Sequence, residues 1–234
     1  TKFLSPGWRM PRNANQSKSS NYSLDFAPTD TISVSGFSTA LSNVNNGTRS
    51  SDNNLPFSWS VWFRSRNSSN SYGEIAGYGQ TQRNGIRIHN NVFRSNYTSD
   101  LAGTTTISQN VWYHGVVTYD GTTRRIYING SLDASDTPSS AAISSQALTI
   151  GVYPGGTSSF NGDLNELCYF DYALSASQVT TLYGTGSAIG NPMALPRTPI
   201  AYYPLGTSAW NGNFLAENNA IGAVSYTHLT LPTK

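Results

Sequence analysis

The chain has 234 residues and a formal net charge of +2, from 14 basic and 12 acidic side chains, with no basic run longer than Arg124 and Arg125. This excludes the electrostatic surface of a nucleic-acid-binding protein. Cys168 is the one cysteine, which excludes an intramolecular disulfide and a cysteine-based zinc cluster, and no run of about 18 apolar residues predicts a membrane span.

Charged residues make up 11% of the chain and aromatic residues 12%, a mixture that favours strands and turns. In FSWSVWFR, alternation places Phe57, Trp59, Val61 and Phe63 on one face and Trp62 on the other. Similar runs lie at residues 22–26, 57–64, 74–78, 85–89, 92–97, 104–108, 111–119, 124–128, 148–153 and 164–169. Short strands at this spacing predict an all-β, two-sheet antiparallel sandwich.

The stretch VWYHGVVTYDGTTRRIYING (111–130) predicts a hairpin. Gly121 in its DGTT turn can adopt a positive φ, and Asn129 with Gly130 turns the chain again after the second strand. The alternation places Arg125 and Tyr127 on the same face of the second strand.

LSASQVTTLYG (174–184) predicts a helix. Ser175 is the expected N-cap, with Gln178 three residues later completing a capping box. Leu174 is placed to pack against Val179, and Gly184 suits the C-terminal end. The pattern predicts one short helix closing a β domain.

SAIGNPMALPRTP carries three prolines in thirteen residues and predicts a linker at 187–199. Beyond it, NGNFLAENNAIG (211–222) resembles SPGWRMPRNANQ (5–16). We therefore predict that residues 200–223 are the truncated start of a second repeat. Residues 1–19 would be the end of a preceding segment or an N-terminal strand.

The last eleven residues, VSYTHLTLPTK (224–234), resemble the conceptual translation of a sequencing-library adaptor. The alternative is a genuine threonine-rich β-strand. On the adaptor interpretation this segment is non-native, and His228 and Lys234 carry no function.

Four stretches between residues 20 and 184 resemble, in this order, the laminin G-like family of concanavalin A-like jelly rolls: NYSLDF, FSWSVWFR, VWYHGVVTYDGTTRRIYING and FNGDLNELCYFDYALSASQVTTLY. The resemblance implies a jelly-roll domain at 20–186 with two antiparallel sheets, one often concave, that binds glycans or proteins. Tandem copies with this asparagine-rich, lysine-poor composition also resemble structural or adhesive proteins of marine phages and bacteria. This implies repeats in the parent protein and an extracellular or virion-surface location.

The family often has an acidic turn after SLDF, where this chain has APTD and keeps only Asp30. A calcium site needs several oxygen ligands, so Asp30 is a metal candidate without the supporting turn. No other cofactor is expected.

Two features argue against an enzyme. In the catalytic branch of the family the carboxylates form a Glu-x-Asp-x-x-Glu motif, whereas the three glutamates here, Glu74, Glu166 and Glu217, are far apart in sequence. Asp163 and Glu166, at i and i+3 of an extended strand, are expected on opposite faces. No G-x-S-x-G nucleophile motif occurs. A glycoside hydrolase remains the catalytic alternative.

Aromatic side chains are the evidence for binding, because a sugar ring stacks on an exposed indole or phenol while polar groups orient it. Trp62 is the first candidate, if its face is the outer one. Tyr127, Arg125 and His114 complete the candidate ligand-binding set, and packing within the sandwich is the alternative for each. YPGGTSSFNG (153–162) lacks the lysine and helix of a phosphate loop and is interpreted as an exposed hairpin rim.

The predicted function is a non-catalytic carbohydrate-recognition module within a larger extracellular or virion-surface protein. Its expected partners are a glycan or a cell-surface protein. The alternative is a structural spacer or protein-interaction domain of a phage tail or fibre.

Overall fold

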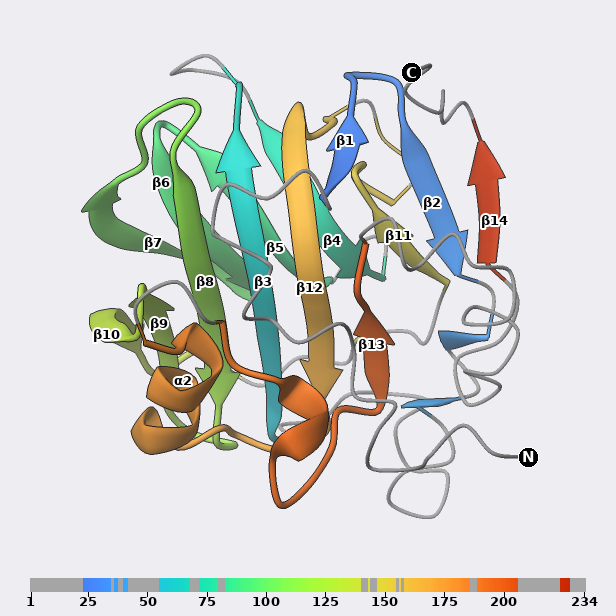
Figure 1. The fold of residues 1–234 in the computed structure, drawn as a ribbon. Helices are drawn as coiled ribbons and strands as arrows, with labels where there is room; N and C mark the ends of the chain where they lie inside the picture. Colours follow the sequence, from blue (N-terminus) through green and yellow to red (C-terminus); the bar gives the residue numbers. More distant parts are fainter. Residues whose placement is uncertain are drawn as a thin grey trace.

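Two antiparallel sheets face each other and form the body of the structure (Figure 1). The computed structural model describes residues 23–34, 36–37, 40–41, 55–67, 72–79, 83–139, 143, 147–154, 156, 158–185 and 189–205, and the backbone of 224–227. Within these residues, sheet A has the order β1-β12-β3-β8-β9-β10, with β13 paired to β12, and sheet B has the order β14-β2-β11-β4-β5-β6-β7. This architecture confirms the predicted all-β antiparallel sandwich.

The strands of sheet A are β1 (Leu24–Phe26), β3 (Phe57–Ser65), β8 (Trp112–Tyr119), β9 (Arg124–Ile128), β10 (Ser131–Asp136), β12 (Gly162–Phe170) and β13 (Ala201–Tyr203). The strands of sheet B are β2 (Thr31–Val34), β4 (Gly73–Tyr78), β5 (Asn84–His89), β6 (Val92–Tyr97), β7 (Ser99–Thr106), β11 (Leu148–Ile150) and β14 (Val224–Thr227). Most lie where alternation predicts them. β2, β10 and β13 were not predicted.

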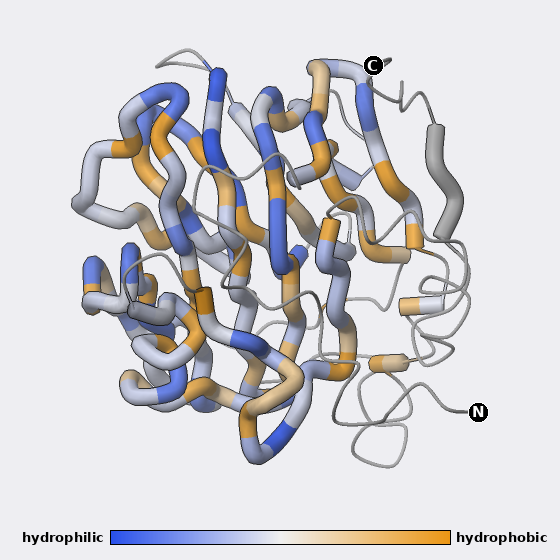
Figure 2. Tube along the Cα trace, in the orientation of Figure 1, coloured by the Kyte–Doolittle hydropathy of each residue, from blue (hydrophilic) through white to orange (hydrophobic). Residues whose placement is uncertain are grey.

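The main core lies between the sheets, where apolar residues recur along the strands (Figure 2). Phe57, Trp59 and Phe63 of β3 point into it, as the alternation predicts. Trp59 Nε1 donates a 2.7 Å hydrogen bond to Asn84 Oδ1 of β5, so the buried indole N–H has an acceptor on the facing sheet.

The turns of the β8–β9–β10 ribbon use left-handed backbone conformations. Gly121 has φ 97°, and Asn129 and Gly130 have φ 51° and 83°. These are residue types that tolerate positive φ, which confirms the turn predictions. β10 has the polar sequence SLDASD without apolar alternation, which explains why periodicity missed it.

Helix α2 (Ala176–Tyr183) confirms the predicted helix. Ser175 Oγ accepts from Gln178 N, and the Gln178 side chain accepts from Ser175 N, so the capping box is complete. Leu174, Val179 and Leu182 are buried in a second apolar cluster on the outer side of sheet A. Figure 1 shows α2 lying across that side.

Residues 189–205 lie against the sandwich. Ile189, Pro192 and Leu195 are buried, and Pro192 begins the 3₁₀ helix η3 (Pro192–Ala194). β13 pairs with Leu167–Tyr169 of β12. The segment predicted as a linker is therefore packed, and β13 extends sheet A. The division of the chain into 1–19, 20–186, 187–199 and 200–223 stays a prediction.

Backbone pairing also includes the C-terminal segment, because β14 runs antiparallel to β2. The adaptor interpretation of 224–234 stays a prediction. Residues 1–19, Glu217, His228 and Lys234 lie outside the described residues. In the described part of the chain, no helix has the length and apolar character of a membrane span.

Candidate functional site

Trp62 is buried, with 3% of its surface exposed, so the geometry favours the alternative of packing within the sandwich over an open binding face. The alternation was right, since Trp62 does point away from the main core. However, Tyr183 of α2 stacks on its ring at 5.7 Å between centroids, and His114 lies 5.1 Å away on the neighbouring strand. The outer face of sheet A is covered by the segment that carries α2.

His114 and Tyr127 are also buried, at 1% and 6% exposure. His114 Nε2 lies 2.9 Å from Ser60 Oγ, and Tyr127 packs in the apolar cluster under α2. Arg125 is partly exposed and pairs with Asp120 at 2.7 Å. None of the four predicted residues lines the cavity described below, so their role in binding stays a prediction that the geometry does not favour.

Asp30 does not fit a calcium site. Its side chain is 5% exposed, and Oδ2 accepts a 2.9 Å hydrogen bond from Ala27 N, which closes the turn between β1 and β2. Among the described residues no group of three or more metal-binding side chains comes together. No step of binding is therefore assigned to a metal.

Asp163 and Glu166 lie on the same side of β12, which corrects the expectation of opposite faces. Glu166 has φ 52°, and the pairing with β3 shifts between Asn165 and Cys168. This β-bulge adds a residue to the strand, so side chains three apart share a face. Leu164 and Leu167 accordingly both point into the main core.

The two carboxylates nevertheless have separate partners. Asp163 pairs with Arg64 and Arg66, whereas Glu166 accepts a hydrogen bond from Tyr202. Burial raises the pKa of Glu166 to about 7, against the lowering effect of the Tyr202 hydrogen bond. Glu166 is 4% exposed and lies beneath the residues that cover sheet A.

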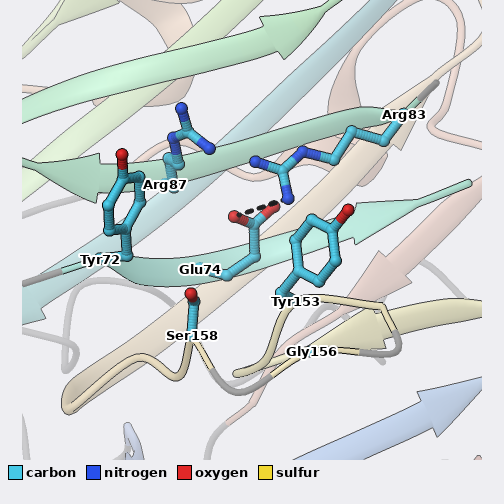
Figure 3. Close-up of a pocket in the computed structure, with 7 residues that line it drawn as sticks. All are labelled: Tyr72, Glu74, Arg83, Arg87, Tyr153, Gly156 and Ser158. Carbon is cyan, nitrogen blue, oxygen red and sulfur yellow. Dashed lines mark ion pairs between the residues drawn. The ribbon is translucent and has the colours of Figure 1, made fainter. Parts of the chain in front are cut away.

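A cavity of about 330 Å³ lies on the opposite side of the molecule, on the outer face of sheet B. Its walls are charged, aromatic or small, and they come from β4, β5 and the loop after β11 (Figure 3). The lining residues, which we call the arginine–tyrosine pocket, are Tyr72, Glu74, Arg83, Arg87, Tyr153, Gly156 and Ser158. Its volume is at the lower end of the roughly 300–1,000 Å³ of small-molecule sites.

Strand alternation explains the floor of the pocket. Ile86 and Ile88 of β5 point into the core, so Arg87 between them points outward. Gly77 and Gly85 are paired beside Glu74. A Cβ at Gly85 would lie 2.8 Å from Glu74 Oε1, so the absence of a side chain there leaves room for the carboxylate.

Glu74 is the buried centre of the pocket, at 1% exposure. Its Oε2 lies 3.6 Å from Arg83 Nη1, an ion pair longer than a hydrogen bond. Burial raises its pKa to about 7, although the guanidinium groups of Arg83 and Arg87 lower it. The carboxyl group therefore changes its charge near neutral pH.

Each of the two arginines is held against a tyrosine ring. The guanidinium carbon of Arg83 lies 4.2 Å from the centroid of Tyr153, and that of Arg87 lies 5.1 Å from the centroid of Tyr72. His89 stacks on Tyr72 at 3.7 Å. These cation–π contacts fix the guanidinium groups on either side of Glu74 (Figure 3).

Several buried polar atoms of the pocket make no hydrogen bond: Glu74 Oε1, Arg83 Nη1 and Arg87 Nε. Buried polar groups without a partner are uncommon in folded proteins, and each calls for an explanation. Together they offer two donors and one acceptor around one cavity. The arrangement can hold a small polar molecule with both hydrogen-bonding roles.

The sequence contains only partial signals for this pocket. It shows Glu74 as one of three glutamates far apart along the chain, and it predicts an exposed hairpin rim at residues 153–162. The rim is a hairpin, with Val152 bridged to Ser159, and it carries Tyr153 and Ser158 to the pocket. The alternation of RNGIRIH could have indicated that Arg87 is outward-facing, but not that Arg83 contacts Tyr153, 70 residues later.

Residues 38–180 match the family model of the Concanavalin A-like lectin/glucanases superfamily. The match covers more than half of the chain. No curated protein sequence matches it.

Solved structures share the fold at low sequence identity. A protein from Bacteroides ovatus described as carbohydrate-binding aligns with a TM-score of 0.60 and 18% identity, covering 80% of this chain and 52% of its own. The CBM40 domain of the Ruminococcus gnavus IT-sialidase, bound to α2,3-sialyllactose, aligns at 0.52 with 13% identity, covering 72% of this chain and 100% of its own. The binding domain of Paraclostridial Mosquitocidal Protein 1 aligns at 0.50 with 16% identity, covering 69% and 44%. This chain thus spans about half the length of the Bacteroides protein.

Proposed function

Because the chain belongs to the Concanavalin A-like lectin/glucanases superfamily, we propose that it is a non-catalytic carbohydrate-binding module whose arginine–tyrosine pocket holds the glycan. The observation that carries the proposal is that buried polar atoms of Glu74, Arg83 and Arg87, which line one cavity, make no hydrogen bond. Sugar hydroxyl groups both donate and accept, so they suit such a mixed set.

Two further observations support the proposal. Tyr72 is 46% exposed at the rim of the pocket, so part of this aromatic residue is accessible to a sugar even though His89 and Arg87 contact its ring. The Bacteroides ovatus and Ruminococcus gnavus structures of the same fold are described as binding carbohydrate. We further propose display outside the cell or on a virion, where free glycans and glycosylated surfaces are met.

A glycan array with the whole chain tests the proposal. Binding that is lost in Tyr72→Ala but kept in Tyr172→Ala is the expected result. Tyr172 is a matched control, because it also carries an arginine over its ring, Arg197 at 4.8 Å, but lies outside the pocket. Absence of binding to every glycan would overturn the proposal and favour a spacer or protein-interaction domain.

A glycoside hydrolase is the second candidate, and one observation favours it. Burial raises the pKa of Glu74 to about 7, a value found for carboxylic acids that protonate a leaving sugar. Such enzymes also need a second carboxylate. The carboxylate that acts on Glu74 is that of Asp100, which Arg87 and Arg94 hold in ion pairs at 3.0 and 2.7 Å. Release of new reducing ends from a bound glycan, abolished in Glu74→Gln, would establish hydrolysis. Binding without release supports the module.

A further inference from the structure

The charges around the arginine–tyrosine pocket do not cancel. Three guanidinium groups, of Arg83, Arg87 and Arg94, meet two carboxylates, of Glu74 and Asp100. Asp100 is shared by Arg87 and Arg94. The surroundings therefore keep a positive charge whether or not Glu74 is ionised.

The two arginines that line the cavity have N–H groups without a hydrogen-bond acceptor. Arg83 and Arg87 side chains are only 8% and 10% exposed, and Arg83 Nη1 and Arg87 Nε donate no hydrogen bond. The tyrosine rings hold both guanidinium planes, so the donors are fixed before a ligand arrives. Water-excluded, pre-oriented guanidinium groups bind planar oxyanions well.

A simple anion does not satisfy the whole pocket, because Glu74 Oε1 lacks a donor. A sugar acid supplies both an acceptor for the arginines and a donor for Glu74 in one molecule. Its carboxylate accepts from the two arginines, and a hydroxyl or amide group donates to Glu74. A neutral sugar would leave the excess positive charge of the three arginines over the two carboxylates uncompensated.

We infer that the arginine–tyrosine pocket recognises a sugar that carries a carboxylate, either a hexuronic acid or a sialic acid, through Arg83 and Arg87. The inference rests on the proposed function and specifies its ligand class. Glu74 orients the sugar through a hydroxyl or amide hydrogen. Tyr72 and Tyr153 position the guanidinium groups.

The assignment predicts that binding is coupled to proton uptake. The charged groups that act on Glu74 are Arg83, Arg87 and Asp100. Burial, and then Arg94 and Arg87, lower the pKa of His89 nearby. A bound carboxylate adds negative charge beside Glu74 and raises its pKa further, so binding takes up a proton. Affinity for the acid sugar should therefore rise as the pH falls from 8 to 6.

The test measures affinity by calorimetry for matched pairs: glucuronic acid against glucose, and sialyllactose against lactose. We expect at least tenfold tighter binding of one acidic member, and the pair that shows it distinguishes uronic from sialic acid. Arg83→Gln and Arg87→Gln should each remove this preference. Arg197→Gln should keep it, because Arg197 is likewise ion-paired and stacked on a tyrosine but lies outside the pocket.

Folding is checked by circular dichroism, and Arg83→Lys provides a second variant that keeps the charge without the forked donors. It should retain only part of the preference. Glu74→Gln should abolish the pH dependence between 8 and 6 while the acidic sugar still binds. These two variants separate a lost contact from a lost fold.

The outcomes separate the two proposals. Equal affinity for acidic and neutral sugars, lost in Tyr72→Ala, would overturn the carboxylate assignment and leave the carbohydrate-binding function intact. Preference for sulfated over carboxylated sugars would also overturn the assignment. Failure to bind any sugar would overturn both.

Discussion

The same alternation of side chains builds the outer faces of the two sheets, but one face is covered by a packed segment and the other carries a cavity. On sheet A, Trp62 and His114 point outward and are covered by the segment that carries α2. On sheet B, Glu74 and Arg87 point outward and line a cavity with Tyr72 exposed at its rim. Alternation decides which residues point away from the core, and the segment packed on a sheet decides whether they reach solvent.

Each outer face contains one buried glutamate whose pKa burial raises to about 7. Glu166 of sheet A accepts a hydrogen bond from Tyr202 and lies under packed residues. Glu74 of sheet B lies between arginines at a cavity. We therefore expect a ligand to change the titration of Glu74, and we expect the titration of Glu166 to affect folding stability.

Trp62→Ala should produce the largest change in stability. Removing a buried indole leaves a cavity under α2, and we expect the free energy of unfolding to decrease by about 3–5 kcal/mol. Urea denaturation measures this. Glycan affinity of the folded fraction should stay unchanged, and a selective loss of affinity at full stability would return Trp62 to the binding site.

Glu166→Gln should reduce the pH dependence of folding. The folded-state pKa of about 7 lies above the ordinary 4.5, so the stability contributed by the proton is fully present below about pH 4.5 and is lost as the pH rises through 7. From pH 5 to pH 8 the free energy of unfolding of the wild type should therefore fall by on the order of 1–3 kcal/mol more than that of the variant. Unfolding curves at both pH values check this, and an unchanged slope would contradict the buried titration.

Ser175→Ala should loosen the cover of sheet A. It removes the N-cap hydrogen bond of α2, with an expected cost of about 1 kcal/mol in the free energy of unfolding. Thr181→Ala, at an exposed position of the same helix, should change stability by less than about 0.5 kcal/mol. Equal effects in both variants would mean that capping does not anchor the helix.

Tyr72→Ala should have the smallest effect on stability, within about 0.5 kcal/mol, because nearly half of the side chain is exposed. The same change should remove glycan binding. Trp62→Ala should do the opposite and reduce stability without reducing glycan affinity. The two variants together therefore distinguish the packed face from the binding face. Thermal unfolding beside calorimetry gives both quantities, and a large drop in melting temperature would show that Tyr72 supports the fold instead.

Much of the fold was predictable because local patterns carry it. The period of two in β3, the left-handed turn residues Asn129 and Gly130, and the capping box of Ser175 are each contained in a few neighbouring residues. The bulge at Glu166 was not predictable, because a single extra residue in a pairing register leaves no trace in periodicity.

The pocket was less predictable, since it depends on contacts between distant segments. Tyr153 contacts Arg83 from a loop 70 residues later in the chain. Gly77 and Gly85 contribute no side chain to the pocket and leave room for the Glu74 carboxylate. Trp62 had the strongest sequence signal for binding, yet α2, more than 110 residues later, covers it. A pattern along one strand cannot report which distant segment packs on it.

Chemical-shift mapping of backbone amides during titration with the best array ligand tests the central claim most directly, since it needs no substitution. The amides of Glu74, Arg87 and Gly156 should shift with ligand concentration, while those of His114 and Tyr127 stay in place. Shifts confined to the β8–β9 side under α2, with none at the arginine–tyrosine pocket, would contradict the account.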